Sequence, residues 1–256
     1  MIINMKKALI YLLVFIGIQL VAGGVVMAAY ILMKGQGTEV DATGLIITTA
    51  LADVTTLVLF LILKWAVVSR HWVRTRPWTV LFWCVLAAIG VIIPSAYLQE
   101  MMPELPNLAE EEFNLIMNNR FGYFVVGLMA PLVEELVFRG AILRELLRWK
   151  RNPWIGIAIS ALMFSAIHMN PAQMPHAFLI GVMLGWMYYR TNSIVPGVVC
   201  HWVNNTIAYV LFAFYPDPDL KTTDFFGNHQ TVLMAVAFSL CILIPSIYQL
   251  NLRMKK

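Results

Sequence analysis

Two adjacent glutamates and an arginine lie in a segment that is otherwise apolar enough to cross a lipid bilayer. They are Glu134, Glu135 and Arg139, within residues 131–139. Charged side chains in lipid are costly and usually face a bundle interior or a hydrated cavity, so they mark functional sites. On a helix, Glu135 and Arg139 share a face, whereas Glu134 points about 100° away. This spacing predicts that Arg139 neutralises Glu135 and leaves Glu134 to act on a substrate or a water. A purely structural ion pair between helices explains the same spacing.

Three further polar side chains of the kinds used in hydrolysis lie in later apolar segments. His168 follows Phe164 by four residues, and Asn205 follows His201 by four, so each pair shares one helix face. A single membrane histidine is commonly a hydrogen-bond partner between helices. A carboxylate and a histidine can instead hold and deprotonate a water, while a second histidine and a carboxamide donate to the oxyanion that forms. With Glu134, these side chains are candidates for amide hydrolysis.

The backbone beside the two glutamates is expected to be irregular. Pro131 lies three residues before Glu134, and proline removes one helical hydrogen bond and frees the carbonyl of Gly127. A kink here would admit water beside the polar groups. The sequence lacks the His-Glu-x-x-His, Gly-x-Ser-x-Gly and Gly-x-Gly-Asp motifs, so zincin, serine and presenilin-type aspartyl hydrolases are not indicated.

The composition is that of a membrane protein. Of the 256 residues, 60% are hydrophobic and only 12% are charged, about half the charged fraction of a soluble protein. The net charge of +4 is modest and gives no indication of nucleic-acid binding. Cys84, Cys200 and Cys241 lie in apolar runs without paired spacing, so neither a disulfide framework nor a cysteine metal site is predicted.

About eight apolar runs are long enough to be membrane-spanning helices. They cover residues 8–33, 44–63, 79–98, 121–143, 153–169, 175–189, 194–214 and 231–250. The sequence therefore predicts an all-α polytopic protein forming a single transmembrane domain over residues 1–256. Between the third and fourth runs, residues 107–120 predict a short helix on the outer surface, with the acidic run 110–112 as a solvated face.

Loop charges predict the orientation, since Lys and Arg concentrate in cytoplasmic loops. The loops on one side of the predicted bundle contain Lys6, Lys7, Lys64, Arg70, Arg74, Arg76, Arg144, Arg148, Lys150, Arg151, Arg190, Arg253, Lys255 and Lys256. The intervening loops contain Glu39, Asp41, Glu100, Glu104, Glu110, Glu111, Glu112, Asp217, Asp219 and Asp224. Both termini are therefore expected in the cytoplasm.

The polar motifs resemble those of a known family when taken in order. Glu134-Glu135-x-x-x-Arg139, Phe164-x-x-x-His168 and His201-x-x-x-Asn205 fall on successive helices of an eight-span chain. This order is similar to that of the CPBP family, which comprises the CAAX-processing endopeptidases of the Rce1 type and the bacteriocin-processing or Abi proteins. The motif-bearing core covers about residues 121–214.

The resemblance implies an intramembrane endopeptidase of the glutamate type. It assigns water activation to Glu134 and His168, oxyanion stabilisation to His201 and Asn205, and support to Glu135, Arg139 and Phe164. Family members are also described as metalloproteases, and Glu134, His168 and His201 could supply three zinc ligands. A mechanism without a cofactor is preferred here, because Asn205 suits oxyanion donation and is a poor zinc ligand.

The resemblance also implies a peptide or a lipid-modified protein tail as substrate. The short loops and the simple charge pattern predict a bacterial plasma membrane as location. A non-catalytic immunity or regulatory protein that binds a peptide in the same cavity is the alternative from another class. A small-solute transporter is a third, although no internal repeat is visible.

Two features near the site are left open by the sequence. Straight helices would place His168 and His201 at different depths, so tilt, a late start of the fifth span or a turn at 170–175 must reconcile them. His176, just past that turn, is expected at the membrane interface.

Overall fold

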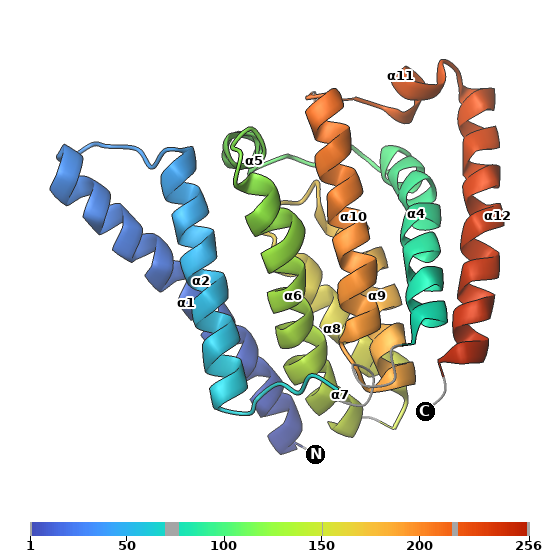
Figure 1. The fold of residues 1–256 in the computed structure, drawn as a ribbon, viewed down its shortest axis with the longest axis horizontal. Coiled ribbons are helices and arrows are strands. Elements are labelled where there is room, and N and C mark those ends of the chain that lie inside the picture. The colour runs from blue at the N-terminus through green and yellow to red at the C-terminus, as the bar shows by residue number, and fades with distance from the viewer. Residues whose placement is uncertain (1, 70–76, 150, 217–219, 255–256) are drawn as a thin grey trace.

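The computed structural model describes residues 2–69, 77–149, 151–216 and 220–254. These residues form helices and loops, with no strand among them (Figure 1). The α-helices are α1 (Ile2–Lys34), α2 (Ala42–Ile62), α4 (Trp78–Glu100), α5 (Glu110–Met117), α6 (Ala130–Glu135), α7 (Arg144–Trp149), α8 (Pro153–Ala166), α9 (Met174–Thr191), α10 (Val195–Phe214), α11 (Thr222–Phe226) and α12 (His229–Arg253), and two π-helices are η1 (Tyr123–Met129) and η2 (Leu136–Leu143). The predicted all-α polytopic class is confirmed.

Each of the eight predicted apolar runs corresponds to a helix or a continuous helical rod in the described residues. Five helices are long and apolar enough to cross a membrane on their own: Asn4–Lys34, Ala42–Ile62, Trp78–Glu100, Val195–Phe214 and His229–Arg253. Most of their surface is not buried inside the protein. Since large apolar side chains in water would be unfavourable, these outward faces identify the lipid-facing perimeter of a multi-pass membrane protein.

The fourth run is one rod that changes its helical winding along its length. From Tyr123 to Trp149 it passes through η1, α6, η2 and α7 without a loop. Pro131 has no N–H, and the wider π-turns lie directly before α6, as expected for a helix whose ladder is interrupted. The predicted irregularity at Pro131 is therefore a π-helical segment. The η2 segment is buried along its whole length, so the rod is the centre of the bundle.

The remaining helices pack around this rod in two groups. On one side, α1 and α2 contact the rod and share an apolar core with α8 and α9. On the other, α4, α9, α10 and α12 form a second core. Figure 1 shows α10 beside α6, with α8 and α9 behind them. The rod, α8, α9 and α10 thus meet around the predicted polar motifs.

The fifth predicted span is shorter than expected. The predicted run 153–169 gives α8, which ends at Ala166 after 14 residues, a rise of about 21 Å. The turn after it is held by the loop before α5, since Asn170 accepts from the Leu108 N–H at 3.1 Å and donates to Asn107 at 2.7 Å. The short helix and this turn set the position of His168, and the rings of His168 and His201 both lie against Phe164.

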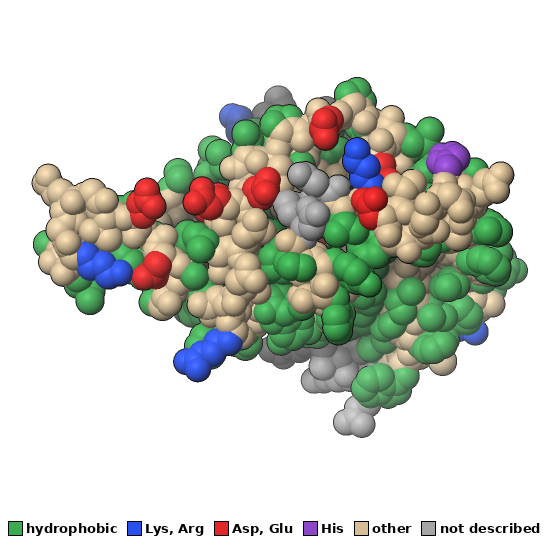
Figure 2. All heavy atoms as spheres, turned by 90° about the horizontal axis from the view of Figure 1, so that it is seen from above, with side chains coloured by type: hydrophobic (Ala, Val, Ile, Leu, Met, Phe, Trp, Pro, Cys, Tyr) green, Lys and Arg blue, Asp and Glu red, His purple; other side chains and the backbone are tan. Residues whose placement is uncertain are grey.

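The two ends of the bundle differ in charge. Figure 1 places the start of α1 and the last turns of α2, α9 and α12 at one end, where the basic loops lie. Figure 2 looks onto the opposite end, where acidic side chains gather. Eight of the predicted loop charges lie outside the described residues: Arg70, Arg74, Arg76, Lys150, Asp217, Asp219, Lys255 and Lys256.

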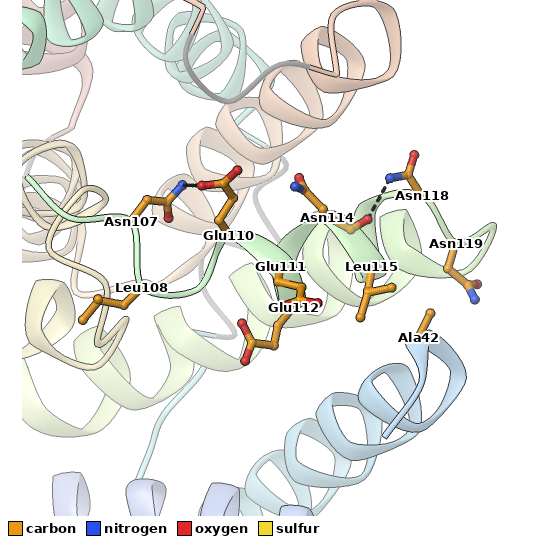
Figure 3. A pocket seen from close by; sticks show the side chains of 10 residues that line it. All are labelled: Ala42, Asn107, Leu108, Glu110, Glu111, Glu112, Asn114, Leu115, Asn118 and Asn119. Atoms are coloured by element: carbon orange, nitrogen blue, oxygen red, sulfur yellow. Dashed lines mark hydrogen bonds between the residues drawn. The ribbon is translucent and has the colours of Figure 1, made fainter. Parts of the chain in front are cut away.

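The acidic end carries the predicted surface helix, α5. Figure 3 shows Glu110, Glu111 and Glu112 of this helix around an open hollow of about 760 Å³ that also includes Ala42 at the start of α2. Asp41 caps α2 by accepting the Gly44 N–H. The Tyr30 hydroxyl, followed by the Gly44 N–H, lowers the pKa of Asp41 to about 2. The low pKa keeps Asp41 ionised at this end of the bundle.

The contact between α4 and α12 gives a stability prediction. A Cβ added at Gly90 would lie 2.8 Å from the backbone nitrogen of Leu243, whereas one added at Gly17 of α1 would meet nothing within 4 Å. We expect Gly90→Ala to destabilise the protein by about 1–3 kcal/mol, because the backbone of α12 must move. Thermal unfolding in detergent measures the effect. Gly17→Ala is the matched control and is expected to be neutral or slightly stabilising. An equal change in the unfolding temperature of both variants would contradict the close approach of α4 and α12.

Candidate active site

A fully buried ion pair forms the base of the polar centre. Arg139 Nη1 donates to Glu135 Oε1 at 2.7 Å, and both side chains are excluded from solvent. Arg139 Nη2 also donates to the Gly181 carbonyl of α9 at 3.2 Å, and its guanidinium lies 4.5 Å from the centre of the Phe164 ring of α8. The predicted neutralisation of Glu135 by Arg139 is present in the structure, and the same guanidinium ties the rod to α8 and α9.

Helix α10 approaches the same carboxylate. A Cβ added at Gly197 would lie 2.6 Å from Glu135 Oε2, so only glycine allows this approach. One turn later, His201 places Nδ1 3.3 Å from Glu135 Oε1. A carboxylate accepts hydrogen bonds, so this contact favours a proton on Nδ1 and directs Nε2 to the other side of the ring.

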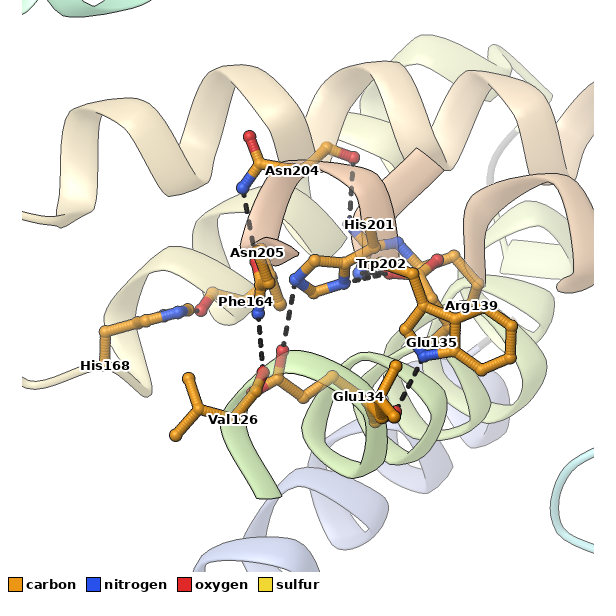
Figure 4. Close-up of polar contacts among 12 residues, drawn as sticks. Val126, Glu134, Glu135, Arg139, Phe164, His168, His201, Trp202, Asn204 and Asn205 are labelled. Carbon is orange, nitrogen blue, oxygen red and sulfur yellow. Dashed lines mark hydrogen bonds and ion pairs between the residues drawn. The ribbon is translucent and has the colours of Figure 1, made fainter. Parts of the chain in front are cut away.

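Glu134 lies on that other side. Its Oε2 is 3.7 Å from His201 Nε2, and its side chain is 17% exposed, whereas that of Glu135 is 0% exposed. Figure 4 shows His201 between the two glutamates. The adjacent carboxylates are thus in different environments, as the helical geometry predicted: one is buried and paired, and the other has access to solvent.

His168 lies at the other edge of the Phe164 ring. Its Nδ1 is 2.9 Å from the Phe164 carbonyl, and its ring centre is 5.1 Å from that of Phe164. The His201 ring is 5.7 Å from the same phenyl ring. Phe164 therefore contacts both predicted histidines. His201 is the histidine placed next to Glu134, while His168 is bonded to its own helix end (Figure 4).

The π-helix in the rod explains the position of Asn205. The Ala130 N–H bonds to the Val125 carbonyl, five residues back, so the Val126 carbonyl is not used by the regular α-helical ladder. Asn205 Nδ2 donates to Val126 at 2.9 Å, and the indole of Trp202 donates to the Leu128 carbonyl at 2.7 Å. One hydrogen of the Asn205 amide group is used in this bond, and an amide NH₂ has two.

Three polar residues that are not among the predicted site residues extend this hydrogen-bond network. His176 Nδ1 is 3.0 Å from Ser95 Oγ, and its Nε2 is 3.3 Å from Asn204 Oδ1. Asn204 then donates to Asn205 at 3.2 Å. His176 is therefore inside the bundle rather than at the interface as expected. The signal was available in the sequence, since Asn204 and His176 are polar residues within apolar runs.

Helix α2 adds a further carboxylate that is not part of the sequence motifs. Asp53 is 3% exposed, interacts electrostatically with Glu134, and has no hydrogen-bond partner for Oδ2 among the described residues. Thr56, one turn later, is also fully buried. An aspartate inside the second apolar run was itself a functional-site signal. Buried polar atoms of this kind are normally satisfied by ordered water, so the region around Glu134 is suited to hold water.

The donor set does not fit the zinc alternative. Among the described residues, no group of three His, Cys, Asp or Glu side chains is spaced to hold a metal ion. Glu134 Oε2 lies 3.7 Å from His201 Nε2, and His168, the third suggested ligand, has its Nδ1 2.9 Å from the Phe164 carbonyl. The arrangement instead offers one solvent-accessible carboxylate, two imidazoles and a carboxamide, which are groups that move protons and stabilise an oxyanion.

The fold and the polar centre define a multi-pass helical membrane protein with a Glu-His site inside the bundle. Residues 117–207 match the family of type II CAAX prenyl endopeptidase Rce1-like proteins. The match covers about a third of the chain and confirms the predicted resemblance to the CAAX proteases of the CPBP family. The matched residues contain all the predicted site residues.

A bacterial relative agrees with this family. The membrane-embedded CAAX protease MroQ of Staphylococcus aureus (strain USA300) is 26% identical over 106 residues, which are 40% of this chain and 43% of the relative. The match thus spans less than half the length of that relative. No solved structure gives a significant match. Together with the apolar helices, the relative supports the predicted bacterial multi-pass membrane protein.

The ion pair gives a second stability prediction. We expect Arg139→Met to cost about 3–5 kcal/mol, because it leaves the Glu135 carboxylate buried without its partner. The double variant Glu135→Leu/Arg139→Met should recover most of that loss, since no uncompensated charge remains. Unfolding in detergent measures both effects.

Arg148→Gln is the matched control for this prediction. It removes the Arg148–Glu145 pair, in which Arg148 is 61% exposed, so a loss below about 1 kcal/mol is expected. A double variant less stable than Arg139→Met would show that the pair is not held together by mutual neutralisation.

Proposed function

We propose that this protein is an intramembrane endopeptidase that hydrolyses a peptide bond with a water activated by Glu134. The observation that carries the proposal is the 3.7 Å separation of Glu134 Oε2 from His201 Nε2, with Glu134 partly exposed beside the fully buried Glu135. A polar contact beyond 3.5 Å is suited to a bridging water. The paired Glu135 supplies no base, because Arg139 already neutralises it.

The reaction begins with the bridging water. Glu134 accepts a proton from the water as its oxygen attacks the carbonyl carbon of the scissile amide. His201 Nε2 holds the water in place, and the contact of Nδ1 with Glu135 fixes the orientation of the ring. The C=O π bond opens, and the carbonyl oxygen becomes an oxyanion.

The oxyanion is stabilised by the amide group of Asn205. The second hydrogen of the Asn205 amide is available for this donation, and the bond to the Val126 carbonyl holds the amide in place. Glu134 then returns its proton to the leaving nitrogen as the C–N bond breaks. His168 donates its Nδ1–H to the Phe164 carbonyl and retains the Nε2 lone pair, so we assign it to the same centre as a hydrogen-bond acceptor that helps to orient the attacking water.

The proposed substrate is a peptide or a lipid-modified protein tail that reaches the site from the membrane. The relative's printed name, a CAAX protease, supports a tail of this class. The apolar perimeter of the bundle suits a substrate that is already anchored in lipid. No cofactor has a place in this mechanism, because Glu134 performs the proton transfers itself.

Replacing Glu134 tests the proposed base. We expect Glu134→Gln to lower the rate of peptide cleavage by at least about 100-fold, since the amide cannot accept the proton. His201→Ala should lower the rate of peptide cleavage by a similar factor. The assay uses the purified full chain in liposomes with candidate prenylated and unmodified peptides, and mass spectrometry locates the cut.

Glu111→Gln is the control, because Glu111 is an exposed glutamate of the surface helix α5, outside the Glu-His centre. Full activity of Glu134→Gln would exclude the proposed base. Peptide binding without cleavage in both the wild type and Glu134→Gln would indicate the non-catalytic peptide-binding alternative.

Chelation tests the metal-free mechanism separately. We expect cleavage by the wild type to continue after prolonged treatment with EDTA and 1,10-phenanthroline, because proton transfer is assigned to Glu134 alone. The initial rate before and after treatment is the measurement. Loss of activity that returns on adding Zn²⁺ would reassign Glu134, His168 and His201 as metal ligands.

A further inference from the structure

A second concave site lies at the basic end of the bundle, away from the Glu-His centre. It has a volume of about 520 Å³, within the range of ligand pockets. Its polar lining comes from Arg144 and Arg148 of the rod, Arg151 before α8, Tyr188 and Tyr189 of α9, and Asn192. No carboxylate is among the residues that line it. We call it the arginine pocket.

The arginine pocket has an excess of positive charge. Glu145 lies beside it and pairs with Arg148 at 3.0 Å and with Arg144 at 3.7 Å. Glu145 thus pairs with two of the three arginines that line the pocket, which leaves two positive charges in excess among these described residues. The hydroxyl groups of tyrosine and the amide of asparagine are further donors. This lining favours an anion with several oxygen acceptors.

Arg144 has an unused donor at the pocket wall. Its Nη2 donates to the Trp65 carbonyl at 2.9 Å, and its side chain is 20% exposed. Its buried Nε, however, has no acceptor among the described residues. Buried donors are normally paired, and a guanidinium binds phosphate or carboxylate oxygens through several N–H groups at once. The N–H of Arg144 Nε is therefore a donor that the described acceptors of the protein leave unused.

The position of the pocket indicates where that anion comes from. The pocket lies between the ends of α7, α8 and α9, at the end of the bundle that carries the basic loops (Figure 1). Trp154, at the first turn of α8, is 54% exposed, as is common for tryptophan at the headgroup level of a membrane. The apolar lining of Val67, Leu147 and Pro153 suits the glycerol and upper acyl region of a lipid.

The pocket is too distant from Glu134 to belong to the reaction centre. Arg144 and Arg148 follow Glu134 by ten and fourteen residues along one continuous rod, which is about 15–21 Å at 1.5 Å per residue. If a peptide is cleaved near its end, the short segment beyond the cleaved bond would not extend from Glu134 to the arginine pocket.

We propose that the arginine pocket binds the phosphate head group of an anionic phospholipid from the leaflet at the basic end. Arg144, Arg148 and Arg151 hold the phosphate, and Tyr188, Tyr189 and Asn192 contact the rest of the head group. Basic pockets between membrane helices on the cytoplasmic side are suited to such lipids. The bound lipid bridges the rod to α9, and a ligand that binds only the folded protein stabilises it.

The test compares lipids and pocket variants in the full chain. The purified protein is placed in nanodiscs of phosphatidylcholine alone or with added phosphatidylglycerol, and bound lipid is counted by native mass spectrometry while thermal unfolding is followed. For the wild type we expect at least tenfold preference for phosphatidylglycerol and a rise of several degrees in the unfolding temperature. Arg148→Gln/Arg151→Gln is expected to abolish both, because these exposed arginines can be replaced without disturbing the core.

Arg253→Gln is the matched control variant. Arg253 is an exposed arginine of α12, outside the pocket and packed over Trp83, so its loss is expected to leave the lipid preference unchanged. An equal reduction in both variants would mean that the preference reflects the general charge of this end and would overturn the proposal.

Two competitors separate a lipid from other anions. Inorganic phosphate at millimolar concentration is expected to compete weakly, since it lacks the glycerol and acyl contacts. Displacement of phosphatidylglycerol by a peptide with a free C-terminal carboxylate would overturn the lipid assignment in favour of a substrate tail. All measurements are repeated with Glu134→Gln. Lipid binding does not use the Glu-His centre, so the proposed protease activity can fail without affecting this result.

Discussion

The buried pair of Glu135 and Arg139 is the constraint around which the bundle is assembled. Each charge alone would carry a large desolvation cost inside the protein, so the two must remain together. Their partners come from every neighbouring layer: Phe164 of α8 under the guanidinium, the Gly181 carbonyl of α9, and His201 of α10 on the carboxylate. A shift of any one helix would leave part of this charge unsatisfied.

The same pair separates two neighbouring carboxylates into different chemical states. Glu135 is enclosed and compensated, whereas Glu134 keeps access to solvent and faces the other nitrogen of His201. The π-helical turn before Pro131 contributes by releasing the Val126 carbonyl, and side chains of α10 and α8 also bond to other carbonyls of the rod. The Val126, Leu128 and Phe138 carbonyls accept from Asn205, Trp202 and Ser160, respectively. Inside a membrane protein such bonds replace the water that would otherwise satisfy the backbone, so α10 and α8 are fixed to the rod by polar contacts.

Much of this arrangement was predictable from the sequence, because lipid imposes simple rules. Apolar runs predicted the helices, and loop charges predicted which loops share an end. The four-residue spacing of Glu135 and Arg139 predicted their ion pair. The period of a helix requires no tertiary information, so these predictions depended only on local geometry.

The remainder depended on packing that no local pattern encodes. The end of α8 at Ala166, and with it the position of His168, is set by hydrogen bonds between Asn170 and a loop more than 60 residues earlier. Asp53 was overlooked because it stands alone in its apolar run, and its relation to Glu134 exists only once α2 contacts the rod. His176 was misplaced for the same reason, since its partners Ser95 and Asn204 come from two other helices.

The shortness of α8 has a consequence for the surrounding lipid. Its 14 residues rise about 21 Å, against a hydrocarbon thickness of about 30 Å. Trp154, Ile155 and Leu162 are exposed along it. Hydrophobic mismatch of this size thins the adjacent bilayer. The acyl chains beside α8 must compress, which brings the aqueous boundary closer to the bundle interior on this flank than elsewhere around its circumference.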